Sequence, residues 1–272
     1  MVPLCRRLLL AAACAAFAAH GLEAQPLSRR ATSAKVAPRS SGEIVVSAAV
    51  SLTDVLQQLV PIYQARSGDR VVLNLGSSNT LARQISFGAG VDVFISADEA
   101  QMDVVAPRLV PGTRVDLLLN QLAIAVPDDR PRTIDSAQAM TDAAIRRIAI
   151  GDPSAVPAGV YARGYLQKLG IWSQLQTKLI PSGSVRLALA AVENGAADAA
   201  IVYHTDIPTA SHAREALLIP QSEGPRIVYP AAVVRNGKNL EGARRLIDFL
   251  RGAEAMAIFA RAGFLVPGPG SR

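Results

Sequence analysis

Short runs of aliphatic and β-branched residues alternate along the chain with longer segments in which apolar residues recur every three or four positions. The short runs predict strands at residues 44–47, 71–75, 91–95, 147–150, 179–180 and 198–203, with extended segments at 117–126 and 227–235. The longer segments predict helices at residues 51–65, 80–87, 100–105, 159–169, 185–194, 240–250 and 254–262. This alternation indicates an α/β fold with mostly parallel strands.

Two extended segments divide the pattern into two parts. The Pro-rich stretch at residues 127–131 ends the first of them, so we expect the chain to cross into a second domain near residue 121 and to return through residues 227–235. We therefore predict lobe I from residues 43–120 plus 229–272, and lobe II from residues 121–228. Two lobes joined by two crossings would hold a ligand between them, where strand ends and helix starts face each other.

The first 24 residues are typical of a secretory signal peptide. Arg6 and Arg7 precede an apolar run over residues 8–19, and Leu22-Glu23-Ala24 offers a cleavage site. The run is too short to span a bilayer, so we expect an exported protein. An N-terminal amphipathic or core helix is the alternative, but the run carries no polar stripe.

Both cysteines lie inside this leader, so the exported chain would have no thiol for redox or zinc chemistry. Cys14 follows a Leu-Ala-Ala-Ala segment that loosely resembles a lipoprotein site. Only about half of the usual apolar run precedes it, and we do not expect a lipid anchor at Cys14. Cys5 has no such context.

The formal net charge of +6 first suggests a nucleic-acid partner. Most of this excess lies before residue 43, however, and residues 25–42 contain Arg29, Arg30, Lys35 and Arg39 with no acidic residue. We interpret residues 25–42 as a flexible linker. The remaining chain is nearly neutral and poor in aromatic residues, so we expect no nucleic-acid binding.

Four strand ends lead through small or hydroxyl residues into helices. These transitions are residues 49–53, 76–80, 156–159 and 182–185. The first amide N–H groups of a helix have no partner within the helix, and the helix dipole places partial positive charge there. Several such ends meeting at one point would hold an anion without Lys or Arg. The alternative for Ser51 and Ser78 is simple helix capping, and for Ser51 the spacing to Asp54 resembles a capping box.

Enzyme and metal-binding functions have weaker support in the sequence. After export only His204 and His212 remain, and neither stands in a nucleophile motif. His204 follows Tyr203 and is the one candidate for acid–base chemistry; we expect a surface or supporting role for it. The His, Asp and Glu residues show no metal-ligand spacing, so we expect no cation site.

Five motifs together give the chain a resemblance to the periplasmic molybdate-binding proteins of ABC-type uptake systems. The resemblance covers about residues 43–266 and rests on Ala48-Ala49-Val50-Ser51-Leu52-Thr53, Ser77-Ser78-Asn79-Thr80-Leu81-Ala82-Arg83-Gln84-Ile85, Ala89-Gly90-Val91-Asp92-Val93-Phe94-Ile95-Ser96-Ala97-Asp98, Gly151-Asp152-Pro153 with Val156-Pro157-Ala158-Gly159, and Ala200-Ile201-Val202-Tyr203. It implies the two-lobed periplasmic-binding-protein type 2 fold, with two parallel-rich sheets flanked by helices. It also implies capture of molybdate or tungstate by hinge closure, delivery to a membrane permease, no cofactor and no catalysis.

The resemblance also implies which residues hold the ion. They are the hydroxyls of Ser51, Ser78 and Tyr203 and the backbone amides of Ala158 and Val185. The chain departs from the family pattern at Val50, at Asn79 and at His204, and the first two bear on the preferred ion through the size of the cavity.

A site built from neutral donors favours fully ionised tetrahedral ions, because a protonated oxyanion brings an O–H that needs an acceptor. Another such ion, for example sulfate, therefore stays open as the ligand, as does a two-lobed enzyme. Asp54, Asp98, Asp152 and Asp206 lie close to the motifs in sequence and are possible acceptors. We expect a monomer, as suits a diffusing carrier.

Overall fold

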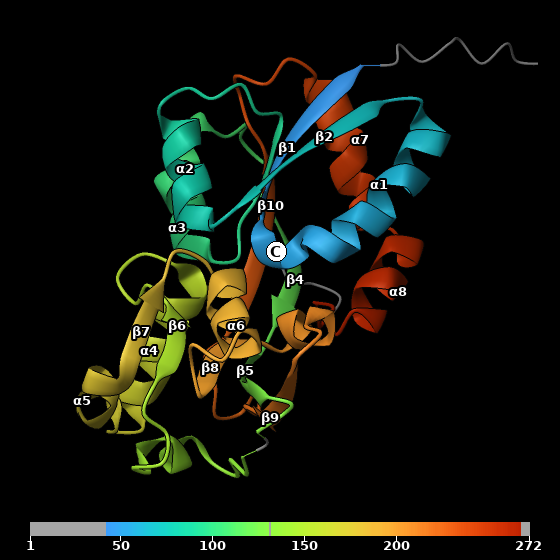
Figure 1. Cartoon of the computed structure of the whole chain (residues 1–272). Helices are drawn as coiled ribbons and strands as arrows, with labels where there is room; N and C mark the ends of the chain where they lie inside the picture. Colours follow the sequence, from blue (N-terminus) through green and yellow to red (C-terminus); the bar gives the residue numbers. More distant parts are fainter. Residues whose placement is uncertain (1–41, 131, 268–272) are drawn as a thin grey trace, which may run out of the picture. The chain divides into compact units, whose positions relative to one another are not determined.

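The computed structural model describes residues 42–130 and 132–267, which belong to one compact unit, Arg39–Arg272 (Figure 1). The expected signal peptide (1–24) and most of the expected linker (25–42), with Cys5 and Cys14, lie outside the described residues. Among the residues described, no helix is long and apolar enough to cross a membrane.

The first sheet has five strands in the order β2-β1-β3-β10-β4. The parallel strands are β1 (Glu43–Ala49), β2 (Arg70–Gly76) and β3 (Val93–Ile95). Strand β10 (Ile227–Val233) runs antiparallel between β3 and β4 (Val115–Asn120). The carboxyl ends of β1 and β2 therefore lie at the same edge of the sheet.

The second sheet repeats this arrangement in the order β7-β6-β8-β5-β9. Its parallel strands are β6 (Ile148–Gly151), β7 (Leu179–Ser182) and β8 (Ala199–Tyr203). Strand β5 (Leu122–Pro127) runs antiparallel between β8 and β9 (Ala213–Leu218). The chain thus leaves the first sheet after Asn120 and returns to it between Leu218 and Ile227.

Helices follow the parallel strands in both halves of the chain (Figure 1). The α-helices are α1 (Thr53–Ser67), α2 (Ser78–Ser86), α3 (Glu99–Val104), α4 (Pro157–Lys168), α5 (Trp172–Leu175), α6 (Val185–Glu193), α7 (Leu240–Leu250) and α8 (Ala253–Arg261). Short 3₁₀ turns are η1 (Val50–Leu52), η2 (Ala106–Arg108), η3 (Ala137–Thr141), η4 (Gln176–Lys178) and η5 (His204–Thr209). Gly170 and Gly195 follow α4 and α6 with positive φ angles, which explains how these helices end.

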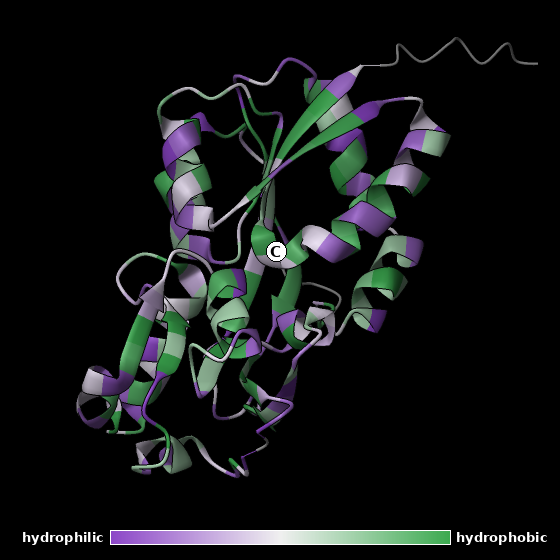
Figure 2. Cartoon of the chain, in the orientation of Figure 1, coloured by the Kyte–Doolittle hydropathy of each residue, from purple (hydrophilic) through white to green (hydrophobic). Residues whose placement is uncertain are grey.

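Helices cover both faces of the first sheet, because its strands are apolar on both sides. Phe94 and Val45 pack against the cluster formed with α2 and α3, whereas Val46 and Ile95 join the larger core. In Figure 2 the strands are mostly hydrophobic, and hydrophilic residues recur on the helices. Buried parallel strands with near-continuous apolar runs are typical of α/β folds.

The structure confirms the predicted α/β fold and corrects some elements. Residues 117–126 form two strands of different sheets, with Gln121 between them. Strand β9 and helix α5 were missing from the prediction. The predicted helix start at Ser51 is wrong: Ser51 lies in η1, α1 begins at Thr53, and no side chain caps α1. The capping box that the spacing of Ser51 and Asp54 resembled is absent, and the Ser51 hydroxyl bonds to Tyr229.

Candidate functional site

A small pocket lies where strand ends of both sheets meet helix starts. Its empty volume, including the part open to solvent, is about 210 Å³. All five predicted ligand positions line it, namely Ser51, Ser78, Ala158, Val185 and Tyr203. These five residues are far apart in sequence. They belong to four helix or turn starts and one strand end, and together they surround one space.

Ser51 reaches the pocket from η1, the turn that directly follows β1. Its side chain is buried, and its Oγ lies 2.9 Å from the hydroxyl oxygen of Tyr229 on β10. Each of these two hydroxyls is able to donate or accept. The direction of this hydrogen bond decides whether Ser51 offers a proton or a lone pair to the pocket.

Ser78 is the first residue of α2, and Ser77 occupies the N-cap position. The backbone N–H of Ala97 donates to Ser78 Oγ at 2.9 Å. A backbone amide is able only to donate, so the Ser78 oxygen is the acceptor in this contact and its own proton remains available. We therefore interpret Ser78 as a donor toward the pocket and not as a helix cap.

Tyr203 is the last residue of β8, and only 1% of it is exposed. Its hydroxyl is buried without a hydrogen-bond partner among the described residues. Burial is the main cause that raises the pKa of the Tyr203 phenol well above its ordinary value, and the neighbouring Tyr229 is the second. The hydroxyl therefore keeps its proton at neutral pH and is a free donor at the pocket wall.

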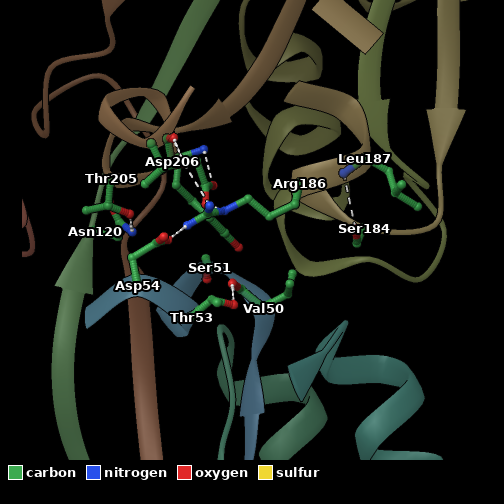
Figure 3. Close-up of polar contacts among 12 residues, drawn as sticks. Val50, Ser51, Thr53, Asp54, Asn120, Ser184, Arg186, Leu187, Thr205 and Asp206 are labelled. Atoms are coloured by element: carbon green, nitrogen blue, oxygen red, sulfur yellow. Dashed lines mark hydrogen bonds and ion pairs between the residues drawn. The ribbon is translucent and has the colours of Figure 1, made fainter. Parts of the chain in front are cut away.

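Ala158 and Val185 stand at the starts of α4 and α6, and both line the pocket. Amides in the first turn of a helix have no acceptor within it and carry partial positive charge. Close packing sets the position of α4: a Cβ on Gly159 would overlap the Gly151 carbonyl oxygen at the end of β6. Ser184 caps α6 by accepting from the Leu187 N–H (Figure 3).

Arg186, next to Val185, forms ion pairs with two carboxylates (Figure 3). Its Nη2 lies 2.6 Å from Asp54 Oδ2 on α1, and its Nε lies 2.6 Å from the buried Asp206 Oδ1 on η5. Burial acts to lower the pKa of Arg186, but Asp206 and Asp54 outweigh it and raise that pKa. Burial raises the pKa of Asp206 to about 6 although Arg186 opposes the shift. This cluster joins α1, which follows a strand of the first sheet, to α6 and η5, which follow strands of the second sheet.

The carboxylates that lie near the motifs in sequence are held elsewhere. Asp54 and Asp206 bind Arg186, Asp98 accepts from the Gln101 N–H and from Ser96, and Asp152 accepts from Ser154. In the described chain none of the four lines the pocket. The pocket wall therefore offers hydroxyls, amides and apolar groups.

His204 lies outside the pocket lining, and its Nδ1 is 2.6 Å from Glu215 Oε2 on β9. Its side chain is about one-third exposed. Within the part of the chain that the structure describes, no three His, Cys, Asp or Glu side chains gather as a metal site.

Sequence reasoning left several pocket residues unassigned. Seven further residues line the pocket: Ala49, Val50, Gly76, Ser77, Ala97, Val156 and Pro157. Six of these lie inside the four predicted strand-to-helix transitions, and Ala97 lies inside one of the family motifs. Of the departures from the family pattern, Val50 contributes to the wall, and Asn79 accepts the Ser77 hydroxyl proton at 2.6 Å. No local signal pointed to Tyr229 or Asn120 behind the wall.

Two similar sheets, two chain crossings and a pocket between strand ends define a solute-binding protein of the two-lobed class. The family model for bacterial extracellular solute-binding proteins matches residues 44–265. The chain belongs to this family, and it is a binding protein and not an enzyme.

Similar proteins include several molybdate-binding proteins. The molybdate-binding protein ModA of Escherichia coli (strain K12) is 40% identical over 231 residues, which cover 83% of this chain and 90% of that protein. The putative ABC transporter substrate-binding lipoprotein YvgL of Bacillus subtilis (strain 168) is 30% identical over 228 residues, which cover 81% of this chain and 85% of that protein. The periplasmic molybdate-binding protein of Azotobacter vinelandii superposes with a TM-score of 0.75 at 26% identity, covering 83% of this chain and all of that chain.

Proposed function

We propose that this protein captures molybdate, and also tungstate, between two lobes and delivers the ion to the permease of an ABC transporter. In this proposal the lobes are residues 43–120 with 229–272, and residues 121–228. The strands support the division, because each sheet draws its strands from one of these parts apart from the first two residues of β10. No bond is made or broken, and binding is coupled to lobe closure.

The observation that carries the proposal is the chemistry of the pocket wall. We propose that the hydroxyls of Ser51, Ser78 and Tyr203 and the amides of Ala158 and Val185 donate to the oxyanion. Charge-assisted hydrogen bonds of this kind contribute about 1.5–3 kcal/mol each before the costs of desolvation and closure. Five such bonds total about 8–15 kcal/mol before those costs, and micromolar affinity needs about 8 kcal/mol net, so the five donors together bring the binding energy into the required range.

The same chemistry favours a fully ionised ligand. A wall without a carboxylate gives no strong acceptor to the O–H of a protonated oxyanion such as hydrogen phosphate. We also propose that the mature protein acts in the periplasm as a monomer after removal of residues 1–24, without a lipid on Cys14. The chain belongs to a family of extracellular solute-binding proteins, and this supports export. Its relative YvgL is named a lipoprotein, which also supports a position outside the cytoplasm.

Isothermal titration of the protein, stripped of bound ions, tests the proposal. Molybdate, tungstate, sulfate and phosphate are added in turn at pH 8. Tight one-to-one binding of molybdate and tungstate, with weak or no binding of the other two, supports the assignment. Preferential binding of sulfate would keep the donor-lined pocket but assign the protein to another uptake system, and no binding of any ion would refute the proposal.

A further inference from the structure

The side chain of Asn120 lies behind the pocket wall in one fixed orientation. It is buried at the end of β4, where the chain crosses from the first sheet to the second. Its Oδ1 accepts the backbone N–H of Gln121 at 2.8 Å. Since that amide is able only to donate, the other end of the side chain must be the NH₂ group.

Both protons of this NH₂ group have acceptors. Asn120 Nδ2 donates to Thr205 Oγ1 at 2.9 Å and to the Tyr229 hydroxyl oxygen at 3.2 Å (Figure 3 shows the contact with Thr205). The Tyr229 oxygen is therefore an acceptor from Asn120. Its single proton is free for its other neighbour, Ser51 Oγ, at 2.9 Å.

The direction of the whole chain of hydrogen bonds follows from these contacts. Asn120 donates to Tyr229, and Ser51 is the only other hydrogen-bond neighbour of the Tyr229 hydroxyl among the described residues. Ser51 is therefore the acceptor available to the Tyr229 proton, and the Ser51 proton is left for the pocket. Were Tyr229 to accept from Ser51 instead, Ser51 would present only lone pairs to an anion. Hydrogen bonds in such a chain also polarise one another and strengthen the terminal donor.

We propose that Asn120 and Tyr229 are positioning residues that make the Ser51 hydroxyl a donor toward a fully ionised oxyanion. This inference rests on the proposed function of the pocket. Neither residue lines the pocket, and the hydrogen-bonded link from Asn120 and Tyr229 to the pocket is Ser51. Ser78 is set as a donor by a different means, the Ala97 amide, and it does not depend on this chain of bonds.

Asn120→Asp tests the direction of the chain while keeping the shape of the side chain. The new carboxylate still accepts from the Gln121 N–H, but it also accepts a hydrogen bond from the Tyr229 hydroxyl. The Tyr229 proton then points to the carboxylate, and the Tyr229 oxygen accepts from Ser51. We expect molybdate affinity at pH 8 to fall at least about tenfold, the equivalent of one charge-assisted hydrogen bond. A negative charge near the site would also weaken binding, so a second background is needed.

That background is Tyr229→Phe, in which the introduced carboxylate is unable to act on Ser51. Here we expect Asn120→Asp to lower affinity by no more than about threefold, so the two substitutions are coupled. Tyr229→Phe itself should weaken molybdate binding in the wild-type background but not in the Ser51→Ala background. If thermal unfolding shows that Asn120→Asp does not fold, the comparison of Tyr229→Phe in the wild-type and Ser51→Ala backgrounds tests the positioning role.

The titrations separate this inference from the proposed function. Tight molybdate binding by the wild type, with equal effects of Asn120→Asp in both backgrounds or of Tyr229→Phe in both backgrounds, would overturn the positioning role alone. Coupled effects measured with sulfate, if the wild type prefers that ion, would uphold the positioning role and refute the molybdate assignment. A wild type that binds none of the ions overturns both.

Discussion

Replacing Tyr203 by Phe should weaken ion binding without lowering the stability of the ion-free protein. The substitution removes one oxygen and keeps the ring, which packs edge-on against Tyr229 with centroids 5.8 Å apart. The Tyr203 hydroxyl is buried and has no partner among the described residues. The folded protein therefore loses no internal hydrogen bond when this oxygen is removed.

The magnitudes follow from the cost of burying an unpaired hydroxyl. Leaving a buried donor unsatisfied costs about 1–3 kcal/mol, so Tyr203→Phe should leave the free energy of unfolding of the ion-free protein unchanged or raise it by about 1 kcal/mol. A hydrogen bond to a charged group contributes about 1.5–3 kcal/mol. Affinity for molybdate should thus fall about 10- to 150-fold.

Urea unfolding of the ion-free protein and isothermal titration with molybdate measure the two effects. Tyr63→Phe is the matched control, because the Tyr63 hydroxyl is also buried but donates to Asp69 at 2.8 Å, away from the pocket. We expect the control to lose about 1 kcal/mol or more of stability and to bind molybdate like the wild type.

A loss of more than about 1 kcal/mol of stability in Tyr203→Phe would show that the hydroxyl has a partner within the protein. Unchanged molybdate affinity would show that it does not contact the ion. Either result would refute the reasoning that Tyr203 keeps its proton for the ligand.

Three further predictions concern the pocket and its supports. Ser78→Ala should weaken molybdate binding by about 1–3 kcal/mol in titrations and leave the buried Ala97 amide without its acceptor; wild-type affinity would remove Ser78 from the site. Gly159→Ala should lower the free energy of unfolding by about 1–3 kcal/mol, because the new methyl overlaps the Gly151 carbonyl; an unchanged urea midpoint would contradict this. Since the pKa of Asp206 is raised from 3.8 to about 6, its contribution to stability should fall as pH rises from about 4 to about 6. The difference in unfolding free energy between wild type and Asp206→Asn measures this fall, and a rise over that window would contradict it.

Much of the fold could be predicted because its strands and helices have clear local patterns. Helix α7 (Leu240–Leu250) matches the prediction at both ends, and Gly170 and Gly195 mark real helix ends. Strand β9 (Ala213–Leu218) was missed because Arg214 and Glu215 interrupt its apolar residues. Strand formation there depends on pairing with β5, a long-range contact that local sequence does not reveal.

The pocket residues could be located because helix starts carry local signals, whereas their supports could not. Ser51 was placed at the pocket by its motif, but its hydrogen-bond partner Tyr229 is distant in sequence and was not predicted. Asn120 and Tyr229 meet only because β4 and β10 are neighbours in the sheet. Hydrogen-bond direction depends on such tertiary contacts, which no short motif encodes.

Diffraction from crystals grown with molybdate, recorded at the molybdenum absorption edge, tests the central claim most directly. We predict one molybdenum atom in the pocket, with its oxygens within about 2.5–3.2 Å of the hydroxyls of Ser51, Ser78 and Tyr203 and of the amides of Ala158 and Val185. A molybdenum atom bound elsewhere, or one held by charged side chains, would contradict the donor-lined pocket as the binding site.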